Sequence, residues 1–164
     1  MAWNAVPEQD YAHYKDRPLT VPDQPPGCSV TRAKLQEWTR LYYANITCAD
    51  RNMGRVLDAL ADLGLVESTI VIFIGDNGFT VGQHGLLGKG NARTLHVDKR
   101  GRISRKRGTR ANMFDDSLLV PFIVRWPGVV KPGSVSDALV STIDILPTLA
   151  YAAGVRTPAC VDGW

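Results

Sequence analysis

The chain has 164 residues, of which 45% are apolar and 21% are charged, and its formal net charge is +3. These values are typical of one globular domain, and no apolar run is long enough to cross a bilayer. Three cysteines without a CxxC pair fit neither a disulfide framework nor a structural zinc site.

Residues 1–32 are predicted to form an extended, irregular lead-in rather than part of a domain core. Few apolar residues recur there, and prolines interrupt the segment at Pro7, Pro18, Pro22, Pro25 and Pro26. The opening residues show neither the basic start nor the apolar stretch of a secretory signal. We therefore expect either a cytoplasmic protein or an N-terminus that lies upstream. Ser29 or Thr31 is expected to cap the helix that follows.

A long helix is predicted over residues 33–63, because apolar side chains recur there in steps of three and four. The apolar set comprises Leu35, Trp38, Tyr42, Ile46, Ala49, Met53, Val56, Leu60 and Leu63. We expect this stripe to pack in the core and Gly64 to end the helix. A glycine within the helix, Gly54, predicts close packing against a neighbouring element.

The next segment, residues 69–74, is apolar and rich in β-branched residues, which predicts a strand buried on both faces. Such strands are typical of an α/β fold with a mostly parallel sheet flanked by helices. The strand ends at Gly75-Asp76-Asn77-Gly78. Ligands of open α/β sheets bind beyond the carboxyl ends of the strands, so Asp76 and Asn77 are candidate site residues.

The donor atoms of this turn suit a hard cation. Asp76 offers a carboxylate oxygen and Asn77 an amide oxygen, and both are ligands suited to Ca²⁺ or Mg²⁺. His84 and Lys89 follow on a glycine-rich loop, where a lysine could hold a tetrahedral oxyanion. The other interpretation is that Asp-Asn-Gly is only a turn.

A basic segment covers residues 91–113 and is predicted to be a loop or long hairpin inserted after the lysine. Its charged residues are eight basic ones and one acid: Arg93, Lys99, Arg100, Arg102, Arg105, Lys106, Arg107, Arg110 and Asp98. Either the segment is a solvent-exposed loop without a role in binding, or it forms a positively charged rim of the site that attracts an anionic substrate. No aromatic residues interleave the basic ones, which disfavours binding to nucleic acid.

The remaining elements alternate between turns, strands and a helix. Residues 114–117 are predicted to turn, and the paired acids Asp115 and Asp116 to cap that turn or balance the basic segment rather than bind metal. Strands are predicted over residues 119–125 and 135–140, with turns between them. A helix is predicted from residue 145 to Gly154, followed by a truncated tail over residues 156–164.

Taken together, these motifs resemble the sulfatase family within the alkaline-phosphatase superfamily. The resemblance rests on GDNG and GQHG, on Lys89, and on residues 41–65, 114–133 and 137–155, and it covers residues 32–155 in order. It implies an incomplete alkaline-phosphatase-like fold in residues 33–155. It further implies that Asp76 and Asn77 bind Ca²⁺, that Lys89 contacts the sulfate, and that His84 is catalytic or lines the rim.

The nucleophile that the resemblance implies is a formylglycine made from the cysteine of a C-x-P-x-R motif. Cys28 and Arg32 have this spacing, but Val30 replaces the proline, and the segment directly abuts the long helix. A helix-start loop is the preferred interpretation. We therefore expect the formylglycine upstream of this sequence, in a periplasmic or extracellular protein, and expect the isolated chain to be inactive.

The expected substrate is a small-molecule sulfate ester or a sulfated glycan. One alternative function is that of a phosphodiesterase or phosphonate monoester hydrolase of the same superfamily. Another alternative is a non-catalytic module that binds polyanions through the basic segment. The identity of the nucleophile in the full-length protein would distinguish a sulfatase from the phosphorus-ester hydrolases. Retention on heparin after Asp76→Ala would favour the polyanion-binding module.

Overall fold

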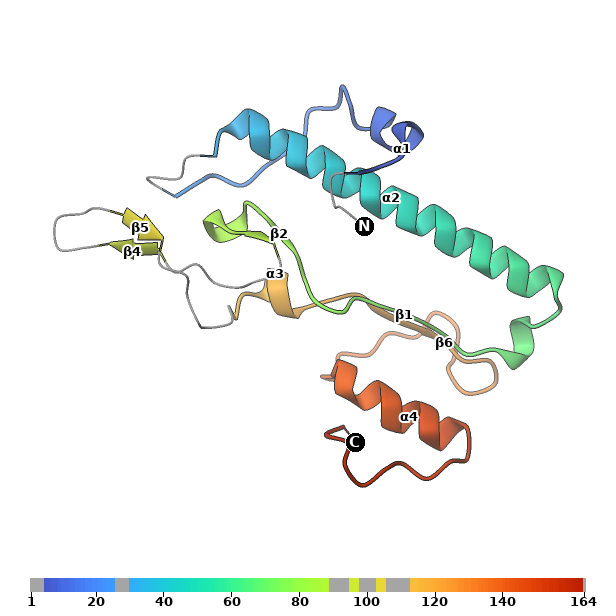
Figure 1. Ribbon diagram of the computed structural model, residues 1–164. Helices are drawn as coiled ribbons and strands as arrows, with labels where there is room; N and C mark the ends of the chain where they lie inside the picture. The colour runs from blue at the N-terminus through green and yellow to red at the C-terminus, as the bar shows by residue number, and fades with distance from the viewer. Residues whose placement is uncertain (1–4, 26–29, 89–94, 98–102, 106–112, 164) are drawn as a thin grey trace. The chain divides into compact units, whose positions relative to one another are not determined.

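A computed structural model describes residues 5–25, 30–88, 95–97, 103–105 and 113–163 (Figure 1). The chain divides into two compact units, Met1–Val124 and Arg125–Trp164. The first unit carries every candidate site residue, and the second carries the last helix. Within the described ranges, no helix combines the length and apolar character needed to cross a membrane.

Helix α2, Arg32–Asp62, is the longest element and begins and ends as the sequence predicts. The side chain of Thr31 caps it, with Oγ1 accepting a hydrogen bond from the backbone N–H of Lys34 at 3.2 Å. Gly64 follows the end of the helix with φ of 67°, a left-handed conformation that glycine adopts without steric cost.

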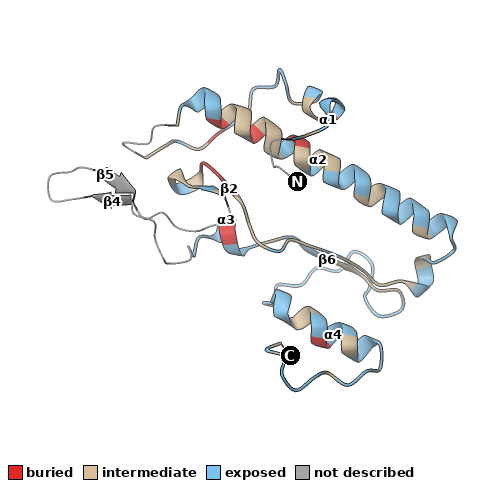
Figure 2. Ribbon diagram, viewed as in Figure 1, coloured by how far each residue is buried: buried red, intermediate tan, exposed pale blue. Residues whose placement is uncertain are grey.

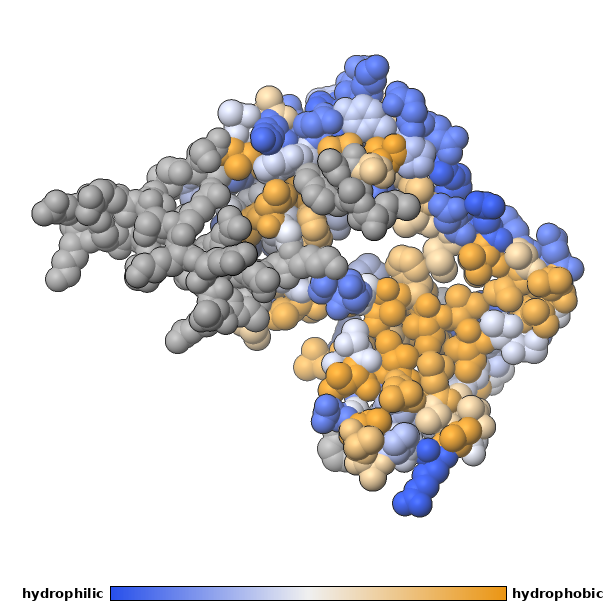
Figure 3. Space-filling view, in the orientation of Figure 1, coloured by the Kyte–Doolittle hydropathy of each residue, from blue (hydrophilic) through white to orange (hydrophobic). Residues whose placement is uncertain are grey.

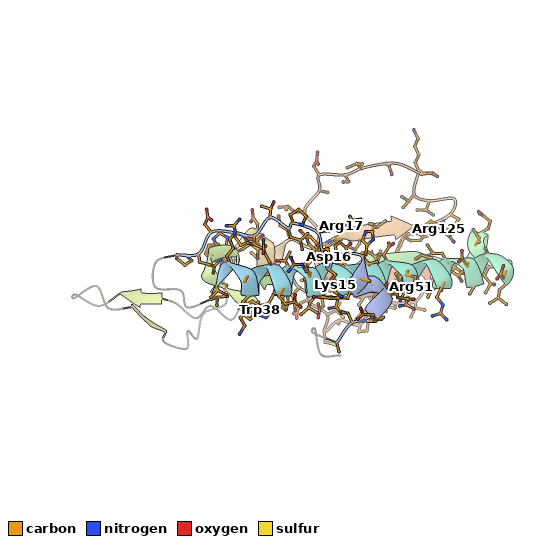
Figure 4. The ribbon with its side chains drawn as sticks, turned by 90° about the horizontal axis from the view of Figure 1, so that it is seen from above. Lys15, Asp16, Arg17, Trp38, Arg51 and Arg125 are labelled. Carbon is orange, nitrogen blue, oxygen red and sulfur yellow. The ribbon has the colours of Figure 1, made fainter. Side chains whose placement is uncertain are left out.

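The lead-in is more ordered than predicted, because it packs along α2. It contains the short helix α1, Glu8–Ala12, whose buried Asp10 forms an ion pair with Arg51 on α2. Figure 4 shows Arg51 on α2 beside α1. Farther along, Val21 is only 5% exposed and belongs to the core. Part of the segment thus contributes to the folded unit.

Tyr11 makes a second link between α1 and α2. Its hydroxyl donates to the carboxylate of Glu37, 2.9 Å from each oxygen. That hydrogen bond, aided by partial burial and by the negative charge of Glu37, raises the pKa of Tyr11 above its ordinary value. The fold therefore favours the neutral phenol.

We expect this link to stabilise the chain only while Tyr11 is neutral. A pKa that is raised in the folded state gives a contribution that is full below about pH 10 and is lost as the pH rises through the folded pKa. Tyr11→Phe should lower the free energy of unfolding at neutral pH by about 0.5–1 kcal/mol. Urea unfolding at neutral and alkaline pH would check this, with the difference between the two proteins shrinking at high pH. A difference that is constant with pH would contradict it.

The core of the first unit lies where the N-terminal half of α2 meets strand β2, Thr80–Val81 (Figure 2). Leu35 is 1% exposed and Thr80 is fully buried. The core's buried apolar residues are Val21, Leu35, Ala44 and Val81.

The prediction that the whole apolar stripe of α2 is packed is wrong. Beyond Ala44, several of its members are largely exposed, including Ile46 at 49%, Val56 at 53% and Leu63 at 70%. Gly54 does not mark close packing either, because a Cβ placed on it would meet no atom within 4 Å. Among the described residues, Leu35 is the one member of the stripe that is fully buried, and Met53 and Leu60 are half-buried. Along its outer face α2 is hydrophilic (Figure 3).

The described strands form three two-stranded sheets rather than one extended parallel sheet. Strands β1 and β6 form one of them, and β2–β3 and β4–β5 are antiparallel hairpins. The remaining bounds are β1 Val71–Ile74, β3 Leu87–Gly88, β4 Leu95–Val97, β5 Ile103–Arg105 and β6 Phe122–Arg125. Full burial of β1 was predicted wrongly, since Phe73 is 39% exposed. The β4–β5 hairpin agrees with the hairpin alternative for the basic segment.

Three short elements complete the first unit. Helix α3, Asp115–Leu118, occupies the predicted turn before β6. The 3-10 helix η1, Val66–Ser68, lies between α2 and β1, and η2, Gln83–Gly85, forms the tip of the β2–β3 hairpin. Of these elements, α3 and η2 contribute directly to the candidate site described below.

In the second unit, helix α4, Ile145–Ala152, agrees with the prediction. It follows the 3-10 helix η3, Thr142–Asp144, where Ser141 and Asp144 form a reciprocal capping box. Figure 3 shows apolar side chains at the surface over α4.

The strand predicted over residues 135–140 does not form. Val135 is 93% exposed and Leu139 is 99% exposed, and no described strand pairs with this segment. A strand is stable only when its backbone pairs and its apolar face packs, so the β-branched composition was not sufficient.

Candidate functional site

The candidate metal turn, Gly75–Gly78, directly follows β1, as predicted. Asp76 is exposed and Asn77 is half-buried. The side-chain Nδ2 of Asn77 donates to the backbone oxygen of Gly78 at 2.9 Å. Because the amide nitrogen is used in this way, the amide oxygen is the atom of Asn77 suited to a cation. The turn therefore offers a carboxylate and an amide oxygen on adjacent residues.

Helix α3 holds this turn through its backbone. The N–H of Gly78 donates to the carbonyl oxygen of Ser117 at 3.0 Å. The approach is close enough to require glycine, since a Cβ placed on Gly78 would lie 2.0 Å from the carbonyl oxygen of Asp116. At the other end of the turn, Gly75 donates to the carbonyl oxygen of Pro121 at 3.3 Å. The segment around α3 thus fixes both ends of the turn.

His84 lies in η2, at the tip of the β2–β3 hairpin. Its φ is 54°, and among the residues that the structure describes it is the one non-glycine residue with a positive φ. This left-handed backbone conformation costs free energy. Backbone hydrogen bonds brace the tip: Gly82 donates to Leu86 at 2.8 Å and Gly85 donates to Gly82 at 3.0 Å.

The lead-in supports the same tip from outside. The Nε2 of Gln24 donates to the carbonyl oxygen of Gly82 at 3.1 Å. A Cβ placed on Gly85 would lie 2.7 Å from Cγ of Pro25, so the backbone of the tip and the lead-in are in close contact. The lead-in therefore helps to place His84.

The ring of His84 contacts two residues from the segment around α3. It stacks on Phe114, with ring centroids 3.7 Å apart and planes 5° from parallel. Its Nε2 lies 3.2 Å from Oδ2 of Asp116. Sequence reasoning missed this contact and assigned Asp116 only to capping or charge balance. No local pattern joins a hairpin tip to a short helix that is distant in the sequence.

Two of the candidate site positions lie outside the described residues. These are Lys89, the predicted sulfate contact, and Cys28, whose spacing matches part of the nucleophile motif. Most of the basic segment lies outside them as well. In the described ranges, no group of three or more His, Cys, Asp or Glu side chains could hold a metal ion. Asp76 and Asn77 fit calcium chemically, but they supply two of the six to eight oxygen ligands that it takes.

A comparison with protein families matches residues 7–155 to the model described as Sulfatase. The chain is 29% identical over 161 residues to N-acetylglucosamine-6-O-sulfatase of Bacteroides thetaiotaomicron, covering 98% of this chain and 24% of the relative. It is 32% identical over 162 residues to Endo-4-O-sulfatase of the same organism, covering 98% and 28%. The chain thus spans about a quarter of the length of these curated relatives.

Solved structures resemble the chain over nearly its full length. One is a protein in complex with its substrate D-glucosamine-2-N,6-O-disulfate, with a TM-score of 0.61 and 28% identity, covering 95% of this chain and 26% of that one. The other belongs to a genetic locus for glycosaminoglycan metabolism in Bacteroides thetaiotaomicron, with a TM-score of 0.68 and 30% identity, covering 99% and 29%. This likeness implies an α/β fold of the same type.

Proposed function

Because this chain belongs to the sulfatase family, we propose that it supplies half of a divalent-metal site and a sulfate-binding lysine to a sulfuric ester hydrolase. The observation that carries the proposal is the Gly75–Gly78 turn, which presents two adjacent oxygen donors at the end of β1. The family match over residues 7–155 and the two oxygen donors together support ligand binding at this turn over chain reversal alone.

The proposed roles follow from the chemistry of each side chain. Asp76 and Asn77 bind Ca²⁺, with Mg²⁺ as the alternative, and a bound divalent ion would polarise the oxygens of a sulfate ester. Lys89 offsets the negative charge of the sulfate as a point charge.

The nucleophile is the part that these residues do not provide. The family's formylglycine arises from a C-x-P-x-R motif, and Val30 stands at the proline position after Cys28. We therefore place the nucleophile outside these 164 residues. With two metal ligands and no nucleophile, the chain alone is expected to be inactive and to bind metal weakly.

The proposed substrate is a sulfated glycan or a smaller sulfate ester. Support comes from two relatives, which are named N-acetylglucosamine-6-O-sulfatase and Endo-4-O-sulfatase, and from the solved complex with a disulfated glucosamine.

Calcium titration of the 164-residue chain tests this proposal. We expect weak Ca²⁺ binding, with a dissociation constant in the millimolar range, and no turnover of an aryl sulfate. Asp76→Ala should abolish the calcium binding, because the anionic ligand contributes most to holding a hard cation. Isothermal titration calorimetry measures the binding, and release of the aryl alcohol measures turnover.

The matched control is Asp58→Ala, which removes an exposed carboxylate from α2 and should leave calcium binding unchanged. Equal calcium affinity in Asp76→Ala and the unmodified chain would overturn the metal role of the turn. Clear turnover by the chain alone would overturn the expectation of inactivity.

A further inference from the structure

His84 is held in one orientation by parts of the chain that are far apart in the sequence. Its backbone has a positive φ, its ring stacks on Phe114, and its Nε2 lies 3.2 Å from the carboxylate of Asp116. The side chain is nevertheless 45% exposed. A strained backbone conformation that orients an exposed imidazole indicates a functional role for the ring.

Asp116 links this ring to the candidate metal turn. Its side chain contacts His84, and its backbone lies against Gly78, where no Cβ would fit. The neighbouring Ser117 accepts the hydrogen bond from Gly78. The position of His84 relative to the turn is therefore set through α3 and not only through the hairpin that carries it.

The contact with Asp116 also determines what each ring nitrogen can do. The carboxylate oxygen of Asp116 lies 3.2 Å from Nε2, and its negative charge favours the tautomer with the proton on Nε2 over the one with a lone pair there. In the neutral imidazole the other nitrogen, Nδ1, then carries a lone pair and accepts. Hydroxyl groups and amide N–H groups are the donors on a saccharide that such a nitrogen would recognise.

We propose that His84 is a substrate-recognition residue whose Nδ1 accepts a hydrogen bond from a hydroxyl or amide group of the sulfated substrate, with Asp116 and Phe114 as its positioning residues. The inference rests on the proposed function for the class of substrate. It goes beyond the proposed function by assigning His84 to the hydroxyl or amide groups of the sugar rather than to the sulfate.

Nuclear magnetic resonance of the ¹⁵N-histidine-labelled chain at mildly alkaline pH tests this directly. We expect the Nε2–H tautomer at His84, and a shift of the Nδ1 resonance when N-acetylglucosamine 6-sulfate is added. His84→Asn keeps a residue that tolerates a positive φ but removes the imidazole. It should lower the affinity for the sugar sulfate about five-fold, as the loss of one hydrogen bond predicts. The affinity for inorganic sulfate, which offers no such group, should stay unchanged.

The variants at residue 116 separate positioning from folding. Asp116→Leu should give a mixture of His84 tautomers and the same loss of affinity as His84→Asn. Asp116→Asn should behave like the unmodified chain, because an amide oxygen can still face Nε2 and favour the proton there. Asp115→Leu is the matched control on the same short helix, and its effect should be small.

The outcomes also distinguish this inference from the proposed function. If the sugar sulfate binds but His84→Asn and Asp116→Leu bind it as tightly as the unmodified chain, the recognition role is wrong while the proposed function stands. If neither sulfate nor sugar sulfate binds with calcium present, the proposed function fails and the recognition role fails with it. An unchanged His84 tautomer in Asp116→Leu overturns the positioning role in either case.

Discussion

Gly78→Ala is expected to separate the candidate metal turn from α3 and to destabilise the chain by about 3 kcal/mol. The added methyl group would lie 2.0 Å from the carbonyl oxygen of Asp116 and 2.7 Å from Cα of Ser117. Both are backbone atoms, so no side-chain rotation relieves the overlap. The hydrogen bond from Gly78 to Ser117 would break, and the contact of His84 with Asp116 should be lost as α3 moves.

Urea unfolding followed by circular dichroism measures the stability change, and the His84 resonances report the local one. Gly54→Ala is the matched control, because a Cβ at this helical position meets no atom within 4 Å. That variant should stabilise the chain by about 0.5–1 kcal/mol, since alanine is the better helix former. Equal stability of Gly78→Ala and the unmodified chain would show that α3 does not pack on the turn as described.

Leu35→Ala is expected to lower the free energy of unfolding by about 2–5 kcal/mol, the range for removing a fully buried leucine side chain. Leu35 is 1% exposed and lies in the first unit's core. A Cβ placed on Gly82 would lie 2.7 Å from Cδ2 of Leu35, so this side chain packs directly beneath the hairpin tip that carries His84. The cavity left by alanine would therefore also loosen the tip.

Leu57→Ala, which truncates a residue of α2 that is 40% exposed, is the matched control and should cost far less. Urea unfolding of the three proteins compares them. If the two alanine variants are equally destabilised, the assignment of the core to the first half of α2 is wrong.

Local sequence signals predicted the elements whose causes are local. The α2 helix, its Thr31 cap and the glycine after its end all follow from features within a few residues. The same holds for α4 and for Gly154, which follows its end. These features are encoded by neighbouring side chains, so a single sequence is sufficient to find them.

The failures concern features that depend on a distant partner. The apolar stripe of α2 shows which face can be buried, but Val56 remains 53% exposed because nothing in the described part of the first unit covers it. Val135 belongs to a segment with strand composition and no pairing strand. The contact of His84 with Asp116 joins the tip of a hairpin to a short helix that is distant in the sequence. No spacing or periodicity in the sequence encodes such contacts.

The candidate site shows the same division. The placement of Asp76 and Asn77 directly after a strand was predicted from the apolar run and the glycines, and β1 confirms the strand. Their role as metal ligands stays a prediction, as does the sulfate contact of Lys89. What only the folded chain reveals is the support around His84, from Phe114 and Asp116 on one side and from the contact of Gln24 with Gly82 on the other.

The close contact of the lead-in with the hairpin tip bears on how this protein can be shortened in the laboratory. Helix boundaries alone would suggest trimming the polypeptide to begin at α2. Such a cut would discard Val21 from the core and the amide of Gln24 that secures Gly82. The trimmed product would keep every proposed ligand in its sequence and yet hold His84 less firmly, so a failed assay with it would say nothing about the chemistry.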